Sequence, residues 1–238
     1  MMQLSAEVLN YLQTFLFVGL PYVSMAIFFV VSIQRYRAES FTYSSLSSQF
    51  LENRTHFWSL VPFHYGLLTV LTGHVVAFLI PRAVLAWNGK PLRLYVLEVC
   101  ALICGLLTVV GLLTAMVRRR RERLVRRVTT RADWILFWIL LFQVSSGVYV
   151  AIFAGWGSSW FASAVTPYLW SLVLFSPDTA YIIGMPLAVK LHIISAFVLI
   201  AYFPFTRLVH VLVVPNMYLW RKPQVVRWYG FRGPKATS

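Results

Sequence analysis

Long apolar stretches alternate with short polar segments along this chain. The stretches run roughly over residues 11–33, 58–80, 94–117, 133–154 and 186–214. Each holds about 20 residues that could form an α-helix across a hydrocarbon core. Hydrophobic residues make up 59% of the chain and charged residues 12%, which excludes a disordered chain and an ordinary soluble domain. The pattern predicts an all-α membrane protein: a bundle of five transmembrane helices over residues 1–217 and a basic tail over residues 218–238.

The distribution of basic residues predicts the orientation of this bundle. No Lys or Arg precedes Arg35, so the first stretch lacks the basic region of a signal peptide and is expected to be a span. Eight arginines lie in residues 118–131 after the third stretch, and residues 155–189 contain no basic residue. By the positive-inside rule, the N-terminus is expected outside and the C-terminus in the cytoplasm.

The net charge of +14 follows from this topology without a nucleic-acid partner. Basic clusters at a membrane face also attract anionic membrane lipid or a docked cytoplasmic subunit. The basic tail could bind either partner. The segment 155–185 is too long for a tight turn. We expect it to lie along the outer surface, anchored in the aromatic belt by Trp156, Trp160, Tyr168, Trp170 and Tyr181.

Four of the five histidines lie inside apolar stretches. His64 and His74 are in the second stretch, and His192 and His210 are in the fifth. A polar ring in hydrocarbon is costly unless it is paired and faces the bundle interior, so these histidines predict a functional site. His56 precedes the second stretch and is expected at the interface.

The topology predicts two histidine pairs at two depths. Because the two helices are antiparallel, His74 should face His192 near the outer side, and His64 should face His210 nearer the cytoplasm. An iron porphyrin takes one neutral imidazole on each face, so the pairs match two non-covalent b-type haems. Covalent attachment is excluded because the chain has no C-x-x-C-H motif. Straight helices would separate the members by about 15 Å in the second helix and about 27 Å in the fifth, a mismatch that helix tilt and a break at Pro204 would absorb.

The residues around the histidines allow two interpretations. Gly66 and Gly73 could let a porphyrin approach the helix, or could serve helix packing, as we expect for Gly105 and Gly111. Candidate cations for haem propionates, which could instead be snorkelling side chains, are Arg207, Lys190 and Arg82. Cys100 and Cys104 are too few for a metal site, and Glu98 is expected to be a helix-start carboxylate.

Short motifs around these positions resemble the gamma, or cytochrome b, subunit of membrane-bound respiratory nitrate reductase. The resemblance covers most of the chain, and all four histidines occur at the ligand positions of that family. The motifs are Ser47-Ser48-Gln49-Phe50-Leu51, Phe63-His64-Tyr65-Gly66, Gly73-His74, Thr129-Thr130-Arg131-Ala132-Asp133, Leu191-His192, Phe203-Pro204-Phe205-Thr206-Arg207-Leu208-Val209-His210, Val214-Pro215, Tyr218-Leu219 and Arg221-Lys222.

The resemblance implies a membrane anchor with two b haems that oxidises quinol near the outer haem. Electrons would pass inward to an iron–sulfur beta subunit and then to a molybdenum alpha subunit that reduces nitrate in the cytoplasm. In this family, His74 and His192 would hold the outer haem, and His64 and His210 the inner one. The quinol pocket would involve Gly73 and His74, with Lys90 or Arg93 as its basic residue.

Other functions remain open at this point. A related di-haem cytochrome could serve a sulfite-reductase-linked or heterodisulfide-reductase-like membrane complex. A metal transporter could use the four histidines as ligands, but it would also need acidic residues, and neither the second nor the fifth stretch contains Asp or Glu. A structural anchor without a cofactor would leave four intramembrane imidazoles unexplained.

Overall fold

The structure, a computed structural model, describes residues 2–39 and 56–213. Five of its helices are long and apolar enough to cross a membrane: Glu7–Ala38, Trp58–Leu79, Pro91–Arg121, Arg131–Phe153 and Leu187–Phe205. They confirm the five predicted spans, and no described residue lies in a β-strand. The basic tail and the motifs at residues 47–51 and 214–222 lie outside the described residues.

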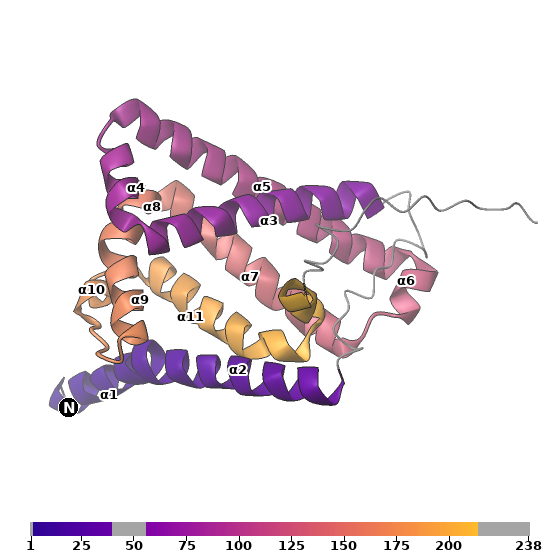
Figure 1. Cartoon of the computed structure of the whole chain (residues 1–238), viewed down its shortest axis with the longest axis horizontal. Coiled ribbons are helices and arrows are strands. Elements are labelled where there is room, and N and C mark those ends of the chain that lie inside the picture. The colour runs from indigo at the N-terminus through magenta and orange to yellow at the C-terminus, as the bar shows by residue number, and fades with distance from the viewer. Residues whose placement is uncertain (1, 40–55, 214–238) are drawn as a thin grey trace, which may run out of the picture.

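The five spans form a curved row with α3 (His56–Leu79) and α2 (Leu20–Ala38) at its two edges. In between, α3 packs on α5 (Pro91–Arg121), α5 on α7 (Arg131–Phe153), α7 on α11 (Leu187–Tyr202), and α11 on α2. Figure 1 shows α3 on one side of the molecule and α11 with α2 on the other, with α7 between them. The helices that carry His74 and His192 therefore lie on opposite sides of α7.

Glycines allow α3 and α5 to approach closely. A Cβ added at Gly66 would lie 2.4 Å from the carbonyl oxygen of Cys104, and one at Gly111 would lie 2.5 Å from the backbone nitrogen of Phe63. Because backbone atoms cannot move aside, neither position can hold a larger residue in this packing. This confirms the packing role expected for Gly111 and decides between the two interpretations of Gly66. A Cβ at Gly73 would meet no atom within 4 Å.

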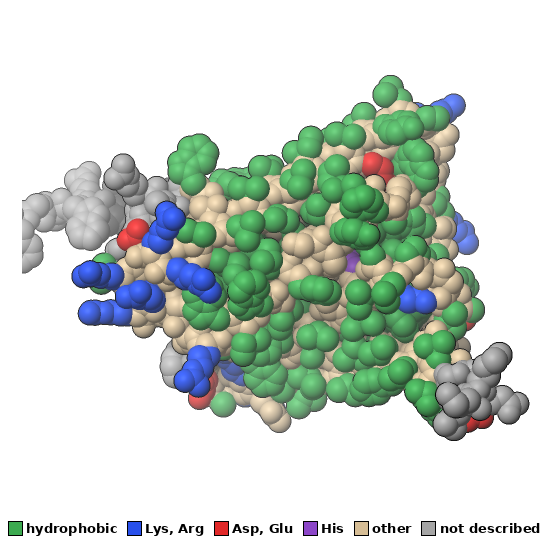
Figure 2. All heavy atoms as spheres, turned by 180° about the vertical axis from the view of Figure 1, so that it is seen from behind, with side chains coloured by type: hydrophobic (Ala, Val, Ile, Leu, Met, Phe, Trp, Pro, Cys, Tyr) green, Lys and Arg blue, Asp and Glu red, His purple; other side chains and the backbone are tan. Residues whose placement is uncertain are grey.

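We call one end of the bundle the arginine-rich end, defined by Arg118–Arg121 of α5, α6 (Arg123–Arg127) and Arg131. Figure 2 shows Lys and Arg side chains gathered at that end and a broad apolar surface over the middle of the molecule. Such a surface is the one expected of helices that face lipid. The chain is a multi-pass membrane protein.

We call the opposite end the capped end, because short helices cover it. These are α4 (Pro81–Asn88), α8 (Gly157–Trp160), a π-helical turn (Phe161–Val165), α9 (Thr166–Val173) and α10 (Ala180–Ile183). Pro81 has no N–H for the carbonyl of Ala77, one turn earlier in α3, and the Thr166 hydroxyl donates to that carbonyl at 3.2 Å. The segment 155–185 thus completes the end of α3.

The expectation that Tyr168 lies in the aromatic belt is wrong. Its side chain is fully buried, in a core cluster with Phe17 and Ile193. Pro21 leaves the carbonyl of Phe17 without its helical amide partner, and the Tyr168 hydroxyl donates to that carbonyl at 2.7 Å. Tyr168 therefore fastens the capped end to the first span, which is built from α1 (Met2–Thr14), a π-helical turn (Phe15–Gly19) and α2.

The fifth helix is shorter than predicted. Instead of continuing to residue 214, α11 ends at Tyr202, and two 3₁₀ segments follow at Phe203–Phe205 and Arg207–Val213. Pro204 cannot donate the backbone hydrogen bond that would continue the helix, and Thr206 is extended. His210 consequently lies on a separate segment, so the axial separation calculated for a straight helix does not apply.

Candidate functional site

His74 of α3 and His192 of α11 lie opposite each other, as the antiparallel arrangement predicted. Their ring centroids are 6.5 Å apart, and their planes are inclined at 43°. The ring of Phe161, from the π-helical turn at the capped end, forms a T-shaped contact with His74 at a centroid distance of 5.1 Å. One histidine pair is thus brought together beneath the capping segment.

The spacing of this pair fits two ligands of one metal ion. An imidazole nitrogen binds a metal at about 2 Å, so two rings on opposite faces of one iron have nitrogens about 4 Å apart and centroids roughly 6 Å apart. The observed 6.5 Å is close to this value. A direct hydrogen bond between the two rings would instead bring their nitrogens to about 3 Å.

Three of the four histidines donate through Nδ1 to a backbone carbonyl in the preceding turn. The acceptors are Leu60 for His64 at 2.7 Å, Val70 for His74 at 2.8 Å and Arg207 for His210 at 2.5 Å. A carbonyl only accepts hydrogen bonds, so Nδ1 carries the proton and Nε2 keeps its lone pair. This is the tautomer of an imidazole that binds a metal through Nε2.

His192 is held by side chains of α7 instead. The Ser146 hydroxyl donates to the Gln143 carbonyl at 2.9 Å, so its oxygen can accept the proton of His192 Nδ1, which lies 3.0 Å away. The Gln143 amide nitrogen lies 3.3 Å from the same Nδ1. A Cβ at Gly147 would come within 2.9 Å of the His192 ring, so only glycine lets the imidazole lie this close to α7.

The second pair lies nearer the arginine-rich end. Phe63, next to His64, and Leu208, two residues before His210, pack against one core cluster of Leu112, Leu136 and Leu140. The described chain segments that carry His64 and His210 therefore border the same core cluster, but no direct contact joins the two rings as it joins His74 and His192. The donor types and tautomers again suit a porphyrin iron.

An ion pair with a buried carboxylate anchors the segment that carries His210. Arg207 donates from Nε to Asp133 Oδ1 at 2.8 Å, from Nη2 to Oδ2 at 3.0 Å, and also to the Val128 carbonyl at 2.7 Å. From α2, Arg35 donates to the carbonyls of Pro204 at 2.6 Å and Thr206 at 3.2 Å. Arg35 thus supplies donors to carbonyls where α11 is broken, and Arg207 ties the segment to the start of α7.

The other candidate cations lie at the capped end. The Lys190 ammonium donates to the Ile183 carbonyl at 2.5 Å, and the Arg93 guanidinium lies 5.1 Å from the centre of the Trp87 ring. Arg82 is in the first turn of α4, and Lys90 precedes α5. Glu98 accepts hydrogen bonds from the backbone N–H and hydroxyl of Ser158, at 2.8 and 2.7 Å, so it fastens α8 to α5.

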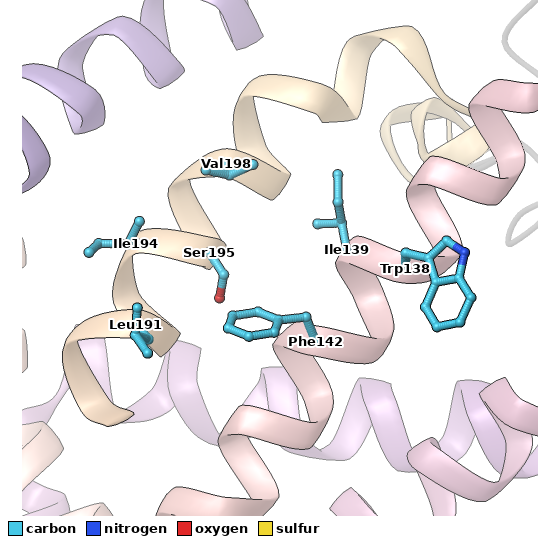
Figure 3. A pocket seen from close by; sticks show the side chains of 7 residues that line it. All are labelled: Trp138, Ile139, Phe142, Leu191, Ile194, Ser195 and Val198. Carbon is cyan, nitrogen blue, oxygen red and sulfur yellow. The ribbon is translucent and has the colours of Figure 1, made fainter. Parts of the chain in front are cut away.

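A shallow groove of about 360 Å³ lies between α7 and α11. Its walls are apolar except for the Ser195 hydroxyl, and Figure 3 shows Ser195 and Phe142 extending toward each other from the two helices. The Ser195 hydroxyl donates to the side-chain oxygen of Gln143. This groove therefore lies beside the polar contacts of His192.

The four histidines do not form one cluster. Among the described residues, no group of three or more His, Cys, Asp or Glu side chains could hold a metal ion. A single site with four imidazole ligands, as a metal transporter would use, is absent from this part of the chain.

Comparison with known proteins identifies the family. The model of the nitrate reductase gamma subunit family matches residues 13–229. The chain belongs to that family.

Curated relatives agree with the family assignment. The nitrate reductase gamma chain of Bacillus subtilis is 34% identical over 212 residues, which cover 87% of this chain and 95% of the relative. The respiratory nitrate reductase 2 gamma chain of Escherichia coli is 32% identical over 228 residues, 92% of this chain and 98% of the relative. A nitrate reductase-like protein of Mycobacterium tuberculosis is 31% identical over 84% of this chain and 32% of its own length. The gamma subunit family resemblance seen in the motifs is therefore confirmed.

The sequence did not reveal the residues that surround the histidines of this family member. Gln143, Ser146 and Gly147 lie within an apolar span, where they look like ordinary small or polar helix residues. Asp133 stands out in the sequence only as the last residue of the motif at 129–133. The one available signal was an amide and a carboxylate inside or at the edge of a membrane helix, because such groups are costly there without partners.

Proposed function

We propose that this chain is the quinol-oxidising membrane subunit of a respiratory nitrate reductase. It would take electrons from quinol at the capped end and deliver them at the arginine-rich end to partner subunits that reduce nitrate. The chain itself has no site for nitrate in this proposal. The relatives that match nearly the whole chain are nitrate reductase chains, which favours this partner over a sulfite-reductase-linked or heterodisulfide-reductase-like complex.

The observation that carries the proposal is the His74–His192 pair, with a ring spacing suited to one iron. In this proposal, His74 and His192 hold an outer b haem, and His64 and His210 an inner one. Two haems at these depths would supply one-electron redox chemistry across most of the membrane. The protein's own part is to hold each imidazole as the Nδ1–H tautomer and to keep the pairs apart along the bundle.

Gly73 and the capping segment suit a quinol site at the outer end. A Cβ at Gly73 would meet nothing within 4 Å, so α3 is open next to His74. Lys90 and Arg93, at the start of α5, are the proposed basic residues of that site. Arg82, Lys190 and Arg207 stay the proposed cations for haem propionates, with Arg207 already shared with Asp133.

Charge favours the arginine-rich end as the cytoplasmic side. Clustered Lys and Arg remain in the cytoplasm during insertion, so the N-terminus would be outside and the quinol protons would leave to the outer water. An iron–sulfur beta subunit, with a molybdenum alpha subunit beyond it, would dock at this end. Anionic lipid headgroups would also bind there.

The first test is a haem count on the purified chain with its partner subunits. A reduced-minus-oxidised spectrum and a pyridine haemochrome should give two b haems per chain. H74A and H192A should each lose the outer haem together with quinol oxidation. H64A and H210A should lose the inner haem and transfer to the partner.

The control is H56A, which alters the histidine that precedes the second apolar stretch. It should keep both haems and full activity. Wild-type protein without haem, prepared with haem in excess, would refute the proposal, as would an H74A variant with two haems and normal quinol turnover.

A further inference from the structure

We propose that α7, which contains no histidine, positions the axial histidines on both sides of the α11 break. Ser146 would orient His192 for the outer haem, and Asp133 would hold His210 through Arg207 for the inner haem. This inference rests on the proposed function, because it assigns positioning residues to the haem ligands named there. This helix, which contains no haem ligand of its own, would thus set the positions of histidines at both haems.

At the outer ligand, the hydrogen-bond directions form a consistent chain. The hydroxyl of Ser195 donates to the Gln143 side-chain oxygen. The Gln143 amide nitrogen lies beside the imidazole, 3.3 Å from Nδ1 and 3.4 Å from Nε2, but an amide N–H only donates and cannot accept the Nδ1 proton. The Ser146 hydroxyl gives its proton to the Gln143 carbonyl. Its oxygen is left as the acceptor for the Nδ1 proton of His192.

The Ser146 contact matters because it replaces the carbonyl acceptor of the other three histidines. A hydrogen bond from Nδ1–H fixes the ring orientation and makes Nε2 a stronger donor to the metal. A stronger donor stabilises the oxidised iron, so loss of the Ser146 oxygen should raise the reduction potential of the outer haem. The inner haem should not respond.

At the inner ligand, the chain of contacts starts at the first turn of α7. Asp133 is 5% exposed, and its carboxylate accepts the backbone N–H of Thr130 at 2.8 Å in a capping box. Both carboxylate oxygens also accept from Arg207. The Arg207 carbonyl in turn accepts the Nδ1 proton of His210 at 2.5 Å.

This connection is needed because the helix does not carry His210. Because α11 ends at Tyr202, seven residues lie between the end of this helix and His210. A bidentate Arg–carboxylate pair fixes a side chain in a planar fork that a single contact does not. Asp133 therefore determines where the Arg207 backbone, and hence the His210 ring, is placed.

The test compares two variants at opposite ends of α7 in the full complex. S146A removes the proposed acceptor of His192, and D133N weakens the partner of Arg207. The matched controls are S145A, one residue away and exposed, and E122Q, which makes the same charge change between α5 and α6. Each is followed by a potentiometric titration that monitors the optical and low-spin EPR signals of both haems, assigned with H192A and H210A.

S146A should shift the redox equilibrium of the outer haem at least threefold toward the reduced form. For a one-electron couple this raises its reduction potential by roughly 30 mV. The signal of the inner haem should not change. D133N should shift or deplete the inner signal and leave the outer one unchanged. Both controls should match the wild type. Where D133N protein is not recovered from membranes, R207K is used, because it keeps the charge and loses the bidentate contact.

The inference is overturned when S146A and D133N, or R207K in its place, leave both haems at wild-type content and potential. It is also overturned when either variant changes both haems equally, since that indicates a general structural effect. Failure of the proposed function looks different: the wild type would hold no b haem, or the histidine variants would keep both.

Discussion

Replacement of Gly147 by alanine tests the proximity of His192 to α7. The added methyl group would lie 2.9 Å from His192 Cε1 and 3.6 Å from each ring nitrogen. Gly73→Ala is the matched comparison, because the same substitution in α3 meets no atom within 4 Å. Both substitutions gain about 1 kcal/mol of helix propensity, so the difference between them reports the contact with the imidazole.

The size of the effect follows from the overlap. Carbon atoms in contact are normally about 3.5–4.0 Å apart, so the methyl group arrives roughly 0.6 Å too close. Overpacking of this kind costs about 1–3 kcal/mol. If this cost is relieved by moving His192 away from its position as a haem ligand, the affinity for the outer haem falls roughly 5- to 150-fold. The imidazole can escape only by leaving the Ser146 oxygen and changing the 6.5 Å spacing to His74.

The assay is haem retention in purified complexes. We expect G147A to lose the outer haem on dilution or to show an altered outer-haem spectrum, with the inner haem retained. G73A should keep both haems and lose quinol oxidation, because its methyl group enters the proposed quinol site. An outer haem in G147A with wild-type content, spectrum and potential would show that the contact does not position His192, and the reasoning would fail.

Three further predictions concern packing and the helix break. Y168F should lower the free energy of unfolding by about 1–3 kcal/mol, measured by thermal unfolding in detergent, and by less in a P21A background, where an N–H becomes available to the Phe17 carbonyl. Burial raises the pKa of the Tyr168 hydroxyl in the folded protein. Its stabilising effect is therefore complete below the pKa of an unfolded tyrosine, about 10, and is lost as the pH rises above that value. The wild type should consequently lose more stability than Y168F in strong alkali. G66V should separate α3 from α5 and deplete both haems, whereas G105A, whose methyl group would be 3.1 Å from a Val148 methyl group, should retain them; equal haem contents would contradict the packing role. P204A allows α11 to continue toward His210 and should weaken the inner haem alone, as judged from the haem spectrum; an unchanged inner haem would mean that the break is not needed.

Much of the fold was predictable because the membrane imposes a simple rule. A segment in hydrocarbon must satisfy its backbone internally, so an apolar run of sufficient length can only be a helix. This rule located all five spans to within a few residues, apart from the end of α11. The end of α11 could not be located because a proline can either kink a helix or end it. Here the helix ends, and Arg35 and Asp133 supply hydrogen-bond partners to the segment that follows.

The capped end could not be derived from local sequence in the same way. Tyr168 and Trp170 are both aromatic residues at the edge of apolar sequence, yet Tyr168 is buried and Trp170 is 37% exposed. Their surroundings differ because Pro21 and Pro81 free carbonyl oxygens on distant helices, which Tyr168 and Thr166 then bind. Such pairings join residues about 90 to 150 positions apart, and nothing in the local pattern specifies them.

The membrane helices, the four intramembrane histidines and the antiparallel relation that brings His74 opposite His192 could be read from the chain alone, because hydrophobic length and charge asymmetry act locally. How the rings are held depends on the packed bundle. The acceptor for His192 comes from α7, and the support for His210 comes from the Arg207–Asp133 ion pair across two segments. Hydrogen-bond direction and ring spacing depend on how helices pack, so they become visible only when the bundle is assembled.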